Sequence, residues 1–289
     1  MTLLKVEGLA KAYDTFRLEE VSLRLPPGYI MGFIGRNGAG KTTTIKAMLN
    51  LVRRDAGRVE ILGQDFDAHE LALKKVIGLA LGGADFYRTT RLDHLTSVFR
   101  RFYDTWDEAA YRDYLARFEL DQTKRIDQLS AGMRVKYCLA LALSHQARLL
   151  ILDEPTSGLD PVSRDDLLDL FRELIESGER SILFSTQITS DLDKCADFIT
   201  YIRDGRLVAS TDAPTFLGSY RLVKGRKDQL TPALQAALIG YKATDLGFTG
   251  LIASPRAGDA EGCQLSAPDI EDIMVFHERT RSDGAEAKP

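Results

Sequence analysis

The chain has 289 residues, a formal net charge of −4 and three cysteines. Because domains run to roughly 100 to 200 residues, this length predicts one large domain, or a domain with an appendage. Acidic and basic residues are both plentiful and no basic stripe stands out, which argues against a nucleic-acid partner.

The N-terminal stretch and the cysteines narrow the cellular context. MTLLKVEGLAKAYD lacks the charged and then apolar plan of a signal peptide, and no stretch reaches the ~18 uninterrupted apolar residues of a membrane span. Cys138, Cys195 and Cys263 are far apart and outside any CxxC spacing. We therefore expect a cytoplasmic chain with reduced, mostly buried thiols, and neither a disulfide framework nor a zinc site.

The first half of the chain changes from strand-like to helical periodicity. Short alternating segments with turn signals fill residues 1–63 and predict strands around a single helix. Thr105 followed by Glu108 has capping-box spacing and predicts a helix start, and residues 131–143 predict a further helix. Residues 92–118 are helical in period, with an apolar stripe that we expect to be core: Leu92, Leu95, Phe99 and Phe102.

Two short apolar runs follow, RLLILDEP at 148–155 and SILFST at 181–186, with a helix-like segment at 166–177 between them. Apolar runs of this kind are typical of buried parallel strands, so the pattern predicts an α/β fold. Asp204 and Gly205 lie between two alternating runs, which is a strong hairpin signal.

The pattern weakens beyond about residue 215. PALQAALIG at 232–240 predicts a short helix, and PDIEDIMVFHER at 268–279 predicts a last one. We expect residues 216–289 to form a small accessory subdomain of α+β type, in which RSDGAEAKP, residues 281–289, is a frayed tail.

A glycine-rich loop follows the strand-like YIMGFI and precedes the helix-like TTIKAML. It fits G-x-x-x-x-G-K-T in the context that the motif requires, whereas a chance glycine loop would not. Its backbone N–H groups and the helix N-terminus form a phosphate site, in which Lys41 reaches the β and γ phosphates and Thr42 holds Mg²⁺. The predicted nucleotide contacts are Gly35, Asn37, Gly38, Ala39, Gly40, Lys41, Thr42 and Thr43.

Asp153 and Glu154 end an apolar strand and supply the second half of a nucleotide site. Asp153 is expected to hold Mg²⁺, directly or through water, and Glu154 to act as general base for the attacking water. Two adjacent carboxylates before Pro155 would also suit a solvated turn, but their combination with the Lys41 loop favours catalysis.

With these motifs the chain resembles the ATP-binding subunits of ABC transporters. Leu129-Ser130-Ala131-Gly132-Met133 looks like the LSGGQ signature of that family with two substitutions. Ser130 is a good N-cap and Gly132 permits close approach, so this helix start can face a phosphate. In the family, the signature residues, here Ser130, Ala131 and Gly132, face the γ-phosphate held by the other subunit.

Two further matches complete the resemblance. Ser157-Gly158-Leu159-Asp160 matches the D-loop, which crosses the dimer interface in the family, so Asp160 is its candidate residue. Tyr13 matches the aromatic residue on which adenine stacks, and Phe16 is its competitor.

The resemblance covers residues 1 to about 212 and implies a P-loop ABC ATPase core with an antiparallel β subdomain and a helical subdomain. We expect the ATPase domain at 1–215, with the helical insert at about 84–128. It implies a homodimer, or a heterodimer with another ABC ATPase subunit, that encloses two ATP molecules with Mg²⁺. It also implies separate membrane permeases, a place on the inner face of the cell membrane, and the exporter branch of bacterial systems.

Two positions depart from the family. Gly82 stands where the family has a metal-contacting glutamine, so either water completes the Mg²⁺ shell or Asp85 reaches in. Gln187 stands where a histidine contacts the γ-phosphate. Glutamine has comparable reach but cannot carry charge, so we expect ATP binding with slowed hydrolysis.

Gln187 has several explanations. It can be a natural variant with slow turnover, part of a degenerate site in a heterodimer, an engineered change, or an ordinary loop residue. The sequence also bears on two other functions. An ABC ATPase acting on nucleic acid or ribosomes would show tandem cassettes or a long coiled coil, whereas this sequence has one cassette and a modest helical insert. Gly82 together with Gln187 leaves a non-hydrolysing regulatory clamp open.

Overall fold

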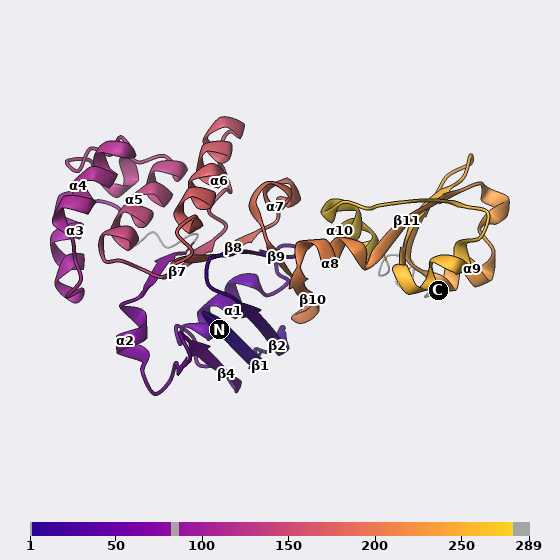
Figure 1. The fold of residues 1–289 in the computed structure, drawn as a ribbon, viewed down its shortest axis with the longest axis horizontal. Helices are drawn as coiled ribbons and strands as arrows, with labels where there is room; N and C mark the ends of the chain where they lie inside the picture. Colours follow the sequence, from indigo (N-terminus) through magenta and orange to yellow (C-terminus); the bar gives the residue numbers. More distant parts are fainter. Residues whose placement is uncertain (1, 82–86, 280–289) are drawn as a thin grey trace. The chain divides into compact units, whose positions relative to one another are not determined.

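The computed structural model describes residues 2–81 and 87–279. The predictions for Gly82, Asp85 and the tail at 281–289 lie outside the described residues. The chain divides into two compact units, Met1–Ser210 and Thr211–Pro289 (Figure 1). Within the described ranges no helix has the length and apolar character that a membrane crossing requires.

The first unit is built on a ten-stranded sheet in the order β5-β4-β1-β2-β10-β9-β3-β8-β7-β6. Its parallel part consists of β3 (Ile30–Ile34), β6 (Ile77–Ala80), β7 (Leu149–Asp153), β8 (Ser181–Thr186) and β9 (Phe198–Arg203). Its antiparallel part consists of β1 (Leu4–Ala12), β2 (Arg17–Leu25), β4 (Ala56–Ile61) and β5 (Gln64–Asp65). The predicted α/β fold with an antiparallel β subdomain is confirmed.

The hairpin predicted at Asp204 and Gly205 connects β9 to β10 (Arg206–Asp212). Both turn residues have positive φ angles, 52° and 77°, as a type I′ turn requires. The Arg206 residue of β10 also pairs with Glu19 of β2, so this hairpin joins the two parts of the sheet.

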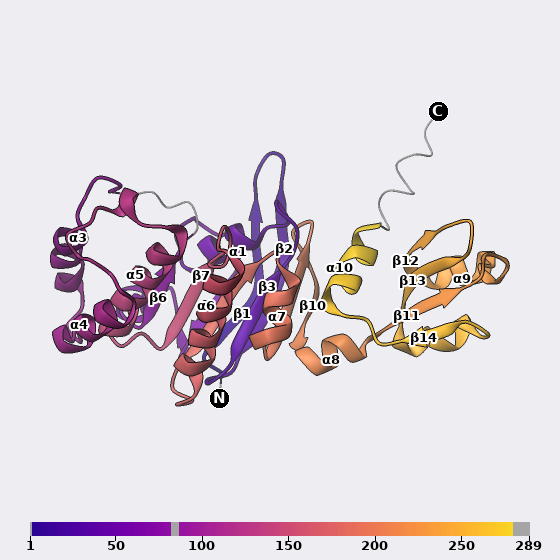
Figure 2. The same cartoon turned by 90° about the horizontal axis from the view of Figure 1, so that it is seen from above.

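The helices of the first unit lie around the parallel strands and in a helical region beside them (Figures 1 and 2). They are α1 (Lys41–Met48), α2 (Glu70–Lys74), α3 (Leu92–Phe99), α4 (Glu108–Arg117), α5 (Ala131–Ser144), α6 (Pro161–Ile175) and α7 (Thr189–Cys195). Two 3₁₀-helices, η1 (Arg100–Phe102) and η2 (Ile126–Gln128), flank α4. All residues of β3, β7 and β8 are buried, because these strands are covered on both faces.

Two predictions in the helical region are wrong in detail. The N-cap of α4 is Asp107, whose carboxylate accepts a hydrogen bond from the Ala110 N–H at 2.9 Å, and not Thr105. The Thr105 hydroxyl instead donates to the His145 carbonyl at 2.8 Å, which takes it away from the helix start. Phe102 is 67% exposed and does not belong to the core, because the chain leaves the α-helix after Phe99 and turns as a 3₁₀-helix.

The second unit has its own sheet and core. Four antiparallel strands lie in the order β12-β13-β11-β14. Their bounds are β11 (Tyr220–Gly225), β12 (Leu238–Ala243), β13 (Phe248–Ala253) and β14 (Gln264–Ser266). The other elements are α8 (Ala213–Gly218), η3 (Lys227–Gln229), α9 (Pro232–Ala237), η4 (Ser254–Ala260) and α10 (Ile270–Arg279). The predicted α+β character is confirmed, and both predicted helices are present, although the first ends at Ala237 because residues 238–240 belong to β12.

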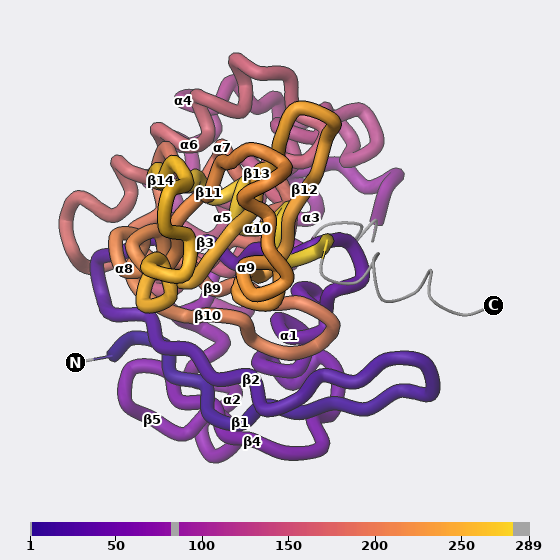
Figure 3. Tube along the Cα trace, turned by 90° about the vertical axis from the view of Figure 1, so that its right-hand side faces the viewer, coloured from indigo at the N-terminus to yellow at the C-terminus, as the bar shows by residue number. Residues whose placement is uncertain are grey.

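The carboxyl ends of the parallel strands position the candidate site. Asp153 of β7 pairs with Ser185 of β8, and Ile34 of β3 pairs with Thr186 of β8. The loops that follow these three strands therefore leave the sheet along one edge, where α/β proteins bind ligands. Figure 3 shows the long β1–β2 hairpin, which carries residue 13 between its strands.

Candidate nucleotide site

The phosphate loop connects β3 to α1. Gly38 and Gly40 have φ angles of 82° and 113°, a region in which other residues are strained. A Cβ at Gly40 would lie 2.8 Å from the Phe16 ring, so glycine also makes room for that side chain. Gly40 caps α1 without a side-chain hydrogen bond, which leaves N–H groups of the first turn for an anion.

Lys41 is the buried cation of this loop, with a relative exposure of 5%. Its ammonium donates to the Gly35 carbonyl at 2.7 Å and lies 3.1 Å from Glu154 Oε1. The positive charge therefore lies between the loop and the candidate general base, where it can neutralise further negative charge.

Asp153 is held by two hydroxyl groups. Thr42 donates to its Oδ2 at 2.8 Å, and Ser185 donates to its Oδ1 at 2.5 Å. Ser185 Oγ also accepts the N–H of Glu154 at 2.9 Å. This serine was not among the predicted site residues, because its place opposite Asp153 follows from the pairing of β7 with β8.

The donor set fits a magnesium ion with a nucleotide. Mg²⁺ prefers oxygen ligands and keeps several waters, so one hydroxyl and one carboxylate from the protein are sufficient. Thr42 and Asp153 supply that pair at 2.8 Å. In the described ranges no group of three or more His, Cys, Asp or Glu residues offers a separate metal site.

Glu154 has two unusual features. Its backbone φ is 53°, in the left-handed region, although it is not a glycine. Its Oε2 is buried and makes no hydrogen bond to any described residue, while Oε1 faces Lys41. Strained residues with free acceptors occur at functional sites, so both features agree with a role as acceptor of a proton.

The candidate signature and the D-loop each supply the side chain that caps the following helix. Ser130 Oγ accepts from the Met133 N–H at 3.2 Å and caps α5. Asp160 caps α6 by accepting from the Val162 and Ser163 N–H groups, both at 3.0 Å. The hydrogen bonds from Ser163 lower the pKa of Asp160 and keep it charged.

The signature glycine also contacts the D-loop. A Cβ at Gly132 would lie 3.2 Å from a methyl carbon of Leu159. Ala131 is exposed and Gly132 is partly so. The start of α5 is therefore open to a partner molecule, as binding in trans requires.

Tyr13 and Gln187 are both exposed. Tyr13 is 47% exposed in the β1–β2 turn, and the Lys11 ammonium lies 5.4 Å from the centre of its ring. Phe16, its competitor for adenine, packs on the phosphate loop at Gly40. Gln187 follows directly on β8, so it leaves the sheet at the same edge as the phosphate loop.

Residues 18–157 match the ABC transporter family. Daunorubicin/doxorubicin resistance ATP-binding protein DrrA of Streptomyces peucetius is 32% identical over 285 residues, which cover 93% of this chain and 86% of DrrA. The chain belongs to the ATP-binding proteins of ABC transporters. Bacitracin transport ATP-binding protein BcrA of Bacillus licheniformis is 31% identical over 72% of this chain and 69% of BcrA.

A solved ATP-binding subunit of an ABC transporter superposes on this ABC protein with a TM-score of 0.66. The two are 27% identical, and the match covers 74% of this chain and 91% of the other. These comparisons confirm the predicted P-loop ABC ATPase fold and the predicted family, an ATP-binding subunit of the bacterial exporter type.

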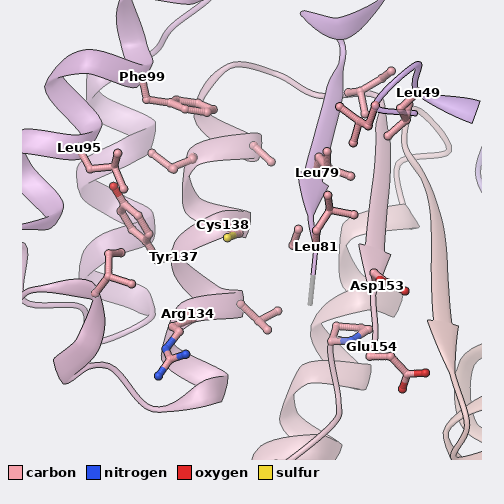
Figure 4. Close-up of a pocket in the computed structure, with 18 of the residues that line it drawn as sticks. Leu49, Leu79, Leu81, Leu95, Phe99, Arg134, Tyr137, Cys138, Asp153 and Glu154 are labelled. Atoms are coloured by element: carbon pink, nitrogen blue, oxygen red, sulfur yellow. The ribbon is translucent and has the colours of Figure 1, made fainter. Parts of the chain in front are cut away.

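The ABC protein also has an apolar cleft of about 900 Å³ in its first unit. Figure 4 shows Tyr137 and Cys138 on one wall and Leu79 and Leu81 on the other, with Glu154 near one end. Thr42, Asp153 and Glu154 line the cleft together with residues of α3 and α5, so it adjoins the nucleotide site. Leu95 and Phe99 of the predicted core stripe line it too and are only partly buried.

Two titratable groups line this cleft, the buried His145 and the partly buried Cys138. His145 is 2% exposed and stacks on Tyr103 at a centroid distance of 3.9 Å. Burial lowers the pKa of His145 to about 4, and it raises the pKa of the Cys138 thiol to about 11. Both side chains are therefore neutral near pH 7, which suits the apolar character of the cleft.

The three cysteines are all free, as predicted. Only Cys195 is fully buried, and Cys138 and Cys263 are partly exposed. The expectation of mostly buried thiols is therefore wrong for two of them.

Proposed function

We propose that this chain binds ATP with Mg²⁺ and forms a closed pair with a second copy or a related ABC subunit. The observation that supports the proposal is the meeting of Lys41, Thr42, Asp153 and Glu154 at one sheet edge. In this pair the phosphate loop of one subunit faces Ser130, Ala131 and Gly132 of the other. Adenine stacks on Tyr13, and Asp160 lies at the contact between the subunits.

Each charged side chain then has a distinct role. Lys41 exchanges its contact with Glu154 for phosphate oxygens, which frees the Glu154 carboxylate to accept a proton from the attacking water. Thr42 and Asp153 would hold Mg²⁺, which would neutralise charge on the phosphates. The ordered hydroxyls of Thr42 and Ser185 keep Asp153 in place.

Gln187 limits the rate of ATP hydrolysis. A glutamine amide can donate to a phosphate oxygen, but it has no positive charge to stabilise the transition state. Loss of one positioning group commonly costs about 10² in rate. We therefore expect normal ATP binding and slow hydrolysis.

The pair of ATP-binding subunits docks onto a separate membrane permease, which holds the chain at the inner face of the cell membrane. The apolar cleft beside the nucleotide site is the surface we assign to it, because its lining joins α3 and α5 to the strand end at Glu154. A helix of the permease in this cleft would sense the nucleotide. We assign residues 1–215 to the ATPase domain, with the helical insert at about 84–128, and residues 216–289 to an accessory subdomain.

Lys41→Ala tests the role of the phosphate loop directly. We expect at least a 10²-fold loss of ATP affinity and loss of ATP-dependent dimers in size-exclusion chromatography, because a charge-assisted phosphate contact disappears. Lys46→Ala is the matched control, since it removes a cation from the same helix outside the carboxylate cluster. Retained dimers of Lys41→Ala on addition of ATP would refute the assignment.

A regulatory clamp that does not hydrolyse ATP is the second candidate, and it is favoured by the uncharged glutamine at position 187. Steady-state ATPase rates of the purified chain, alone and with its permease, separate the two. Turnover stimulated by the permease supports the transport motor. ATP binding without turnover in either state supports the clamp.

A further inference from the structure

Two buried side chains outside the nucleotide site, Thr156 and Asp191, lie with the half-buried Arg164 around one point of the first unit. Thr156 is fully buried and follows Glu154 by two residues. Asp191 is 1% exposed and lies in the first turn of α7, four residues after Gln187. The three residues therefore connect the segments that follow β7 and β8.

Arg164 brings in a third segment. It lies in the first turn of α6, four residues after the D-loop residue Asp160, and its N–H bonds the Asp160 carbonyl at 3.0 Å. Its Nε lies 3.9 Å from Asp191 Oδ1. The helices α6 and α7 that carry the two charges run side by side (Figure 2).

The contacts within this cluster are incomplete. Thr156 Oγ1, Arg164 Nε and Asp191 Oδ2 are all buried, and none makes a hydrogen bond of good geometry within the described part of the chain. Burial raises the pKa of Asp191, while the nearby hydroxyls of Thr156 and Thr186 and the charges of Arg164 and Lys194 oppose that shift. Buried polar atoms are nearly always satisfied, and an apolar trio would fill this space at less cost, so the cluster calls for an explanation.

A small displacement would complete the cluster. An N–H···O hydrogen bond needs a distance of about 2.9 Å, so an approach of about 1 Å between α6 and α7 would turn the loose Arg164–Asp191 pair into a bonded one. Closely packed helices shift between discrete arrangements because packed interiors do not deform continuously, so a second, bonded arrangement of this pair is physically reasonable.

We propose that Asp191 is a positioning residue that links the D-loop helix to the switch segment. Contact of Asp160 with the second subunit moves α6, Arg164 closes on Asp191, and Gln187 is drawn into place opposite Glu154. The inference rests on the proposed function, because it assigns a partner across the D-loop. It adds residues that act on the rate of hydrolysis without touching the nucleotide.

Steady-state kinetics of Asp191→Asn and Arg164→Gln test this link in the full chain. We expect kcat to fall about 10-fold or more, with KM and the affinity for a fluorescent ATP analogue within about 2-fold of wild type. Asp165→Asn is the matched control, because Asp165 pairs with Lys194 on the exposed side of the same two helices. It should keep the wild-type kcat.

Thr156→Val separates positioning from folding. Valine keeps the shape and removes the unbonded hydroxyl, so thermal stability should not fall, whereas kcat should fall about 3-fold or more. Unchanged kcat in both Thr156→Val and Asp191→Asn would overturn the inference. If Asp191→Asn does not fold, Thr156→Val alone decides.

A double-mutant comparison tests the connection to the switch. If Asp191 positions residue 187, the gain in rate expected from Gln187→His should disappear in the Asp191→Asn background. An equal fold gain in both backgrounds overturns the link. The proposed function fails separately, if the wild-type chain neither binds ATP nor hydrolyses it.

Discussion

The phosphate-loop side and the switch side of the same sheet edge are held in different ways. Both oxygens of Asp153 accept hydrogen bonds, from Thr42 and Ser185. Asp191 on the switch side is buried as deeply, yet one of its oxygens accepts no bond from the described residues and its arginine partner lies 3.9 Å away. Complete contacts fix a binding geometry, whereas incomplete ones leave room for a change, so we expect the first side to govern binding and the second to govern rate.

The largest expected effect is that of Glu154→Gln. Removing the proton acceptor should lower the ATPase rate about 10²- to 10³-fold, and ATP binding should persist because Lys41 and Thr42 remain. Steady-state hydrolysis and fluorescent-nucleotide titration measure the two effects. Glu173→Gln is the matched control, since Glu173 pairs with Arg117 on the surface.

Loss of binding in Glu154→Gln would contradict the division between binding and rate. A rate close to wild type would show that Glu154 is not the proton acceptor in hydrolysis. Either result would contradict the assignment of ATP binding to the phosphate-loop side of the sheet edge and of the hydrolysis rate to the groups around the γ-phosphate.

The contrast in hydrogen bonding predicts unequal effects on stability. Ser185→Ala removes a donor to Asp153 and an acceptor for the Glu154 N–H, so the free energy of unfolding should fall by ~1–3 kcal/mol. Thr156→Val removes a hydroxyl with no hydrogen bond among the described residues and should change it by less than ~0.5 kcal/mol. Urea unfolding followed by the fluorescence of the single tryptophan, Trp106, reports on the first unit. Equal losses would show that the two sides are held alike.

The smallest effect is expected from Gln187→His. A histidine can carry charge near neutral pH, so the ATPase rate should rise several-fold with little change in ATP affinity. Gln187→Asn is the control, because it shortens the amide without adding charge and should not raise the rate. Equal rates for wild type and Gln187→His would contradict the switch assignment.

The sequence predicted the parts of the fold that local chemistry dictates. The phosphate loop, the carboxylates at the end of β7 and the Asp204-Gly205 turn each need particular residues at fixed spacing, so they could be found without a structure. The start of α4 could not, because Thr105 and Asp107 are both good caps and the choice depends on the distant His145 carbonyl. Tertiary contacts of this kind leave no local pattern.

The same limit applies to the site. Ser185 and Asp191 read as ordinary polar residues, in a strand and in an amphipathic helix. Their importance comes from parallel pairing with Asp153 and from burial beside Arg164. The exposure of Phe102 was missed because the helical period continues through residue 102 while the backbone does not.

The left-handed backbone of Glu154 has a consequence for protein engineering. Glycine and asparagine adopt a φ near 53° at less cost than glutamate, so either replacement relieves local strain while it removes the proton acceptor. A library of random variants screened for heat resistance alone should therefore enrich inactive chains at this codon. Selection for ATP turnover should instead retain glutamate at position 154, although its backbone is strained there.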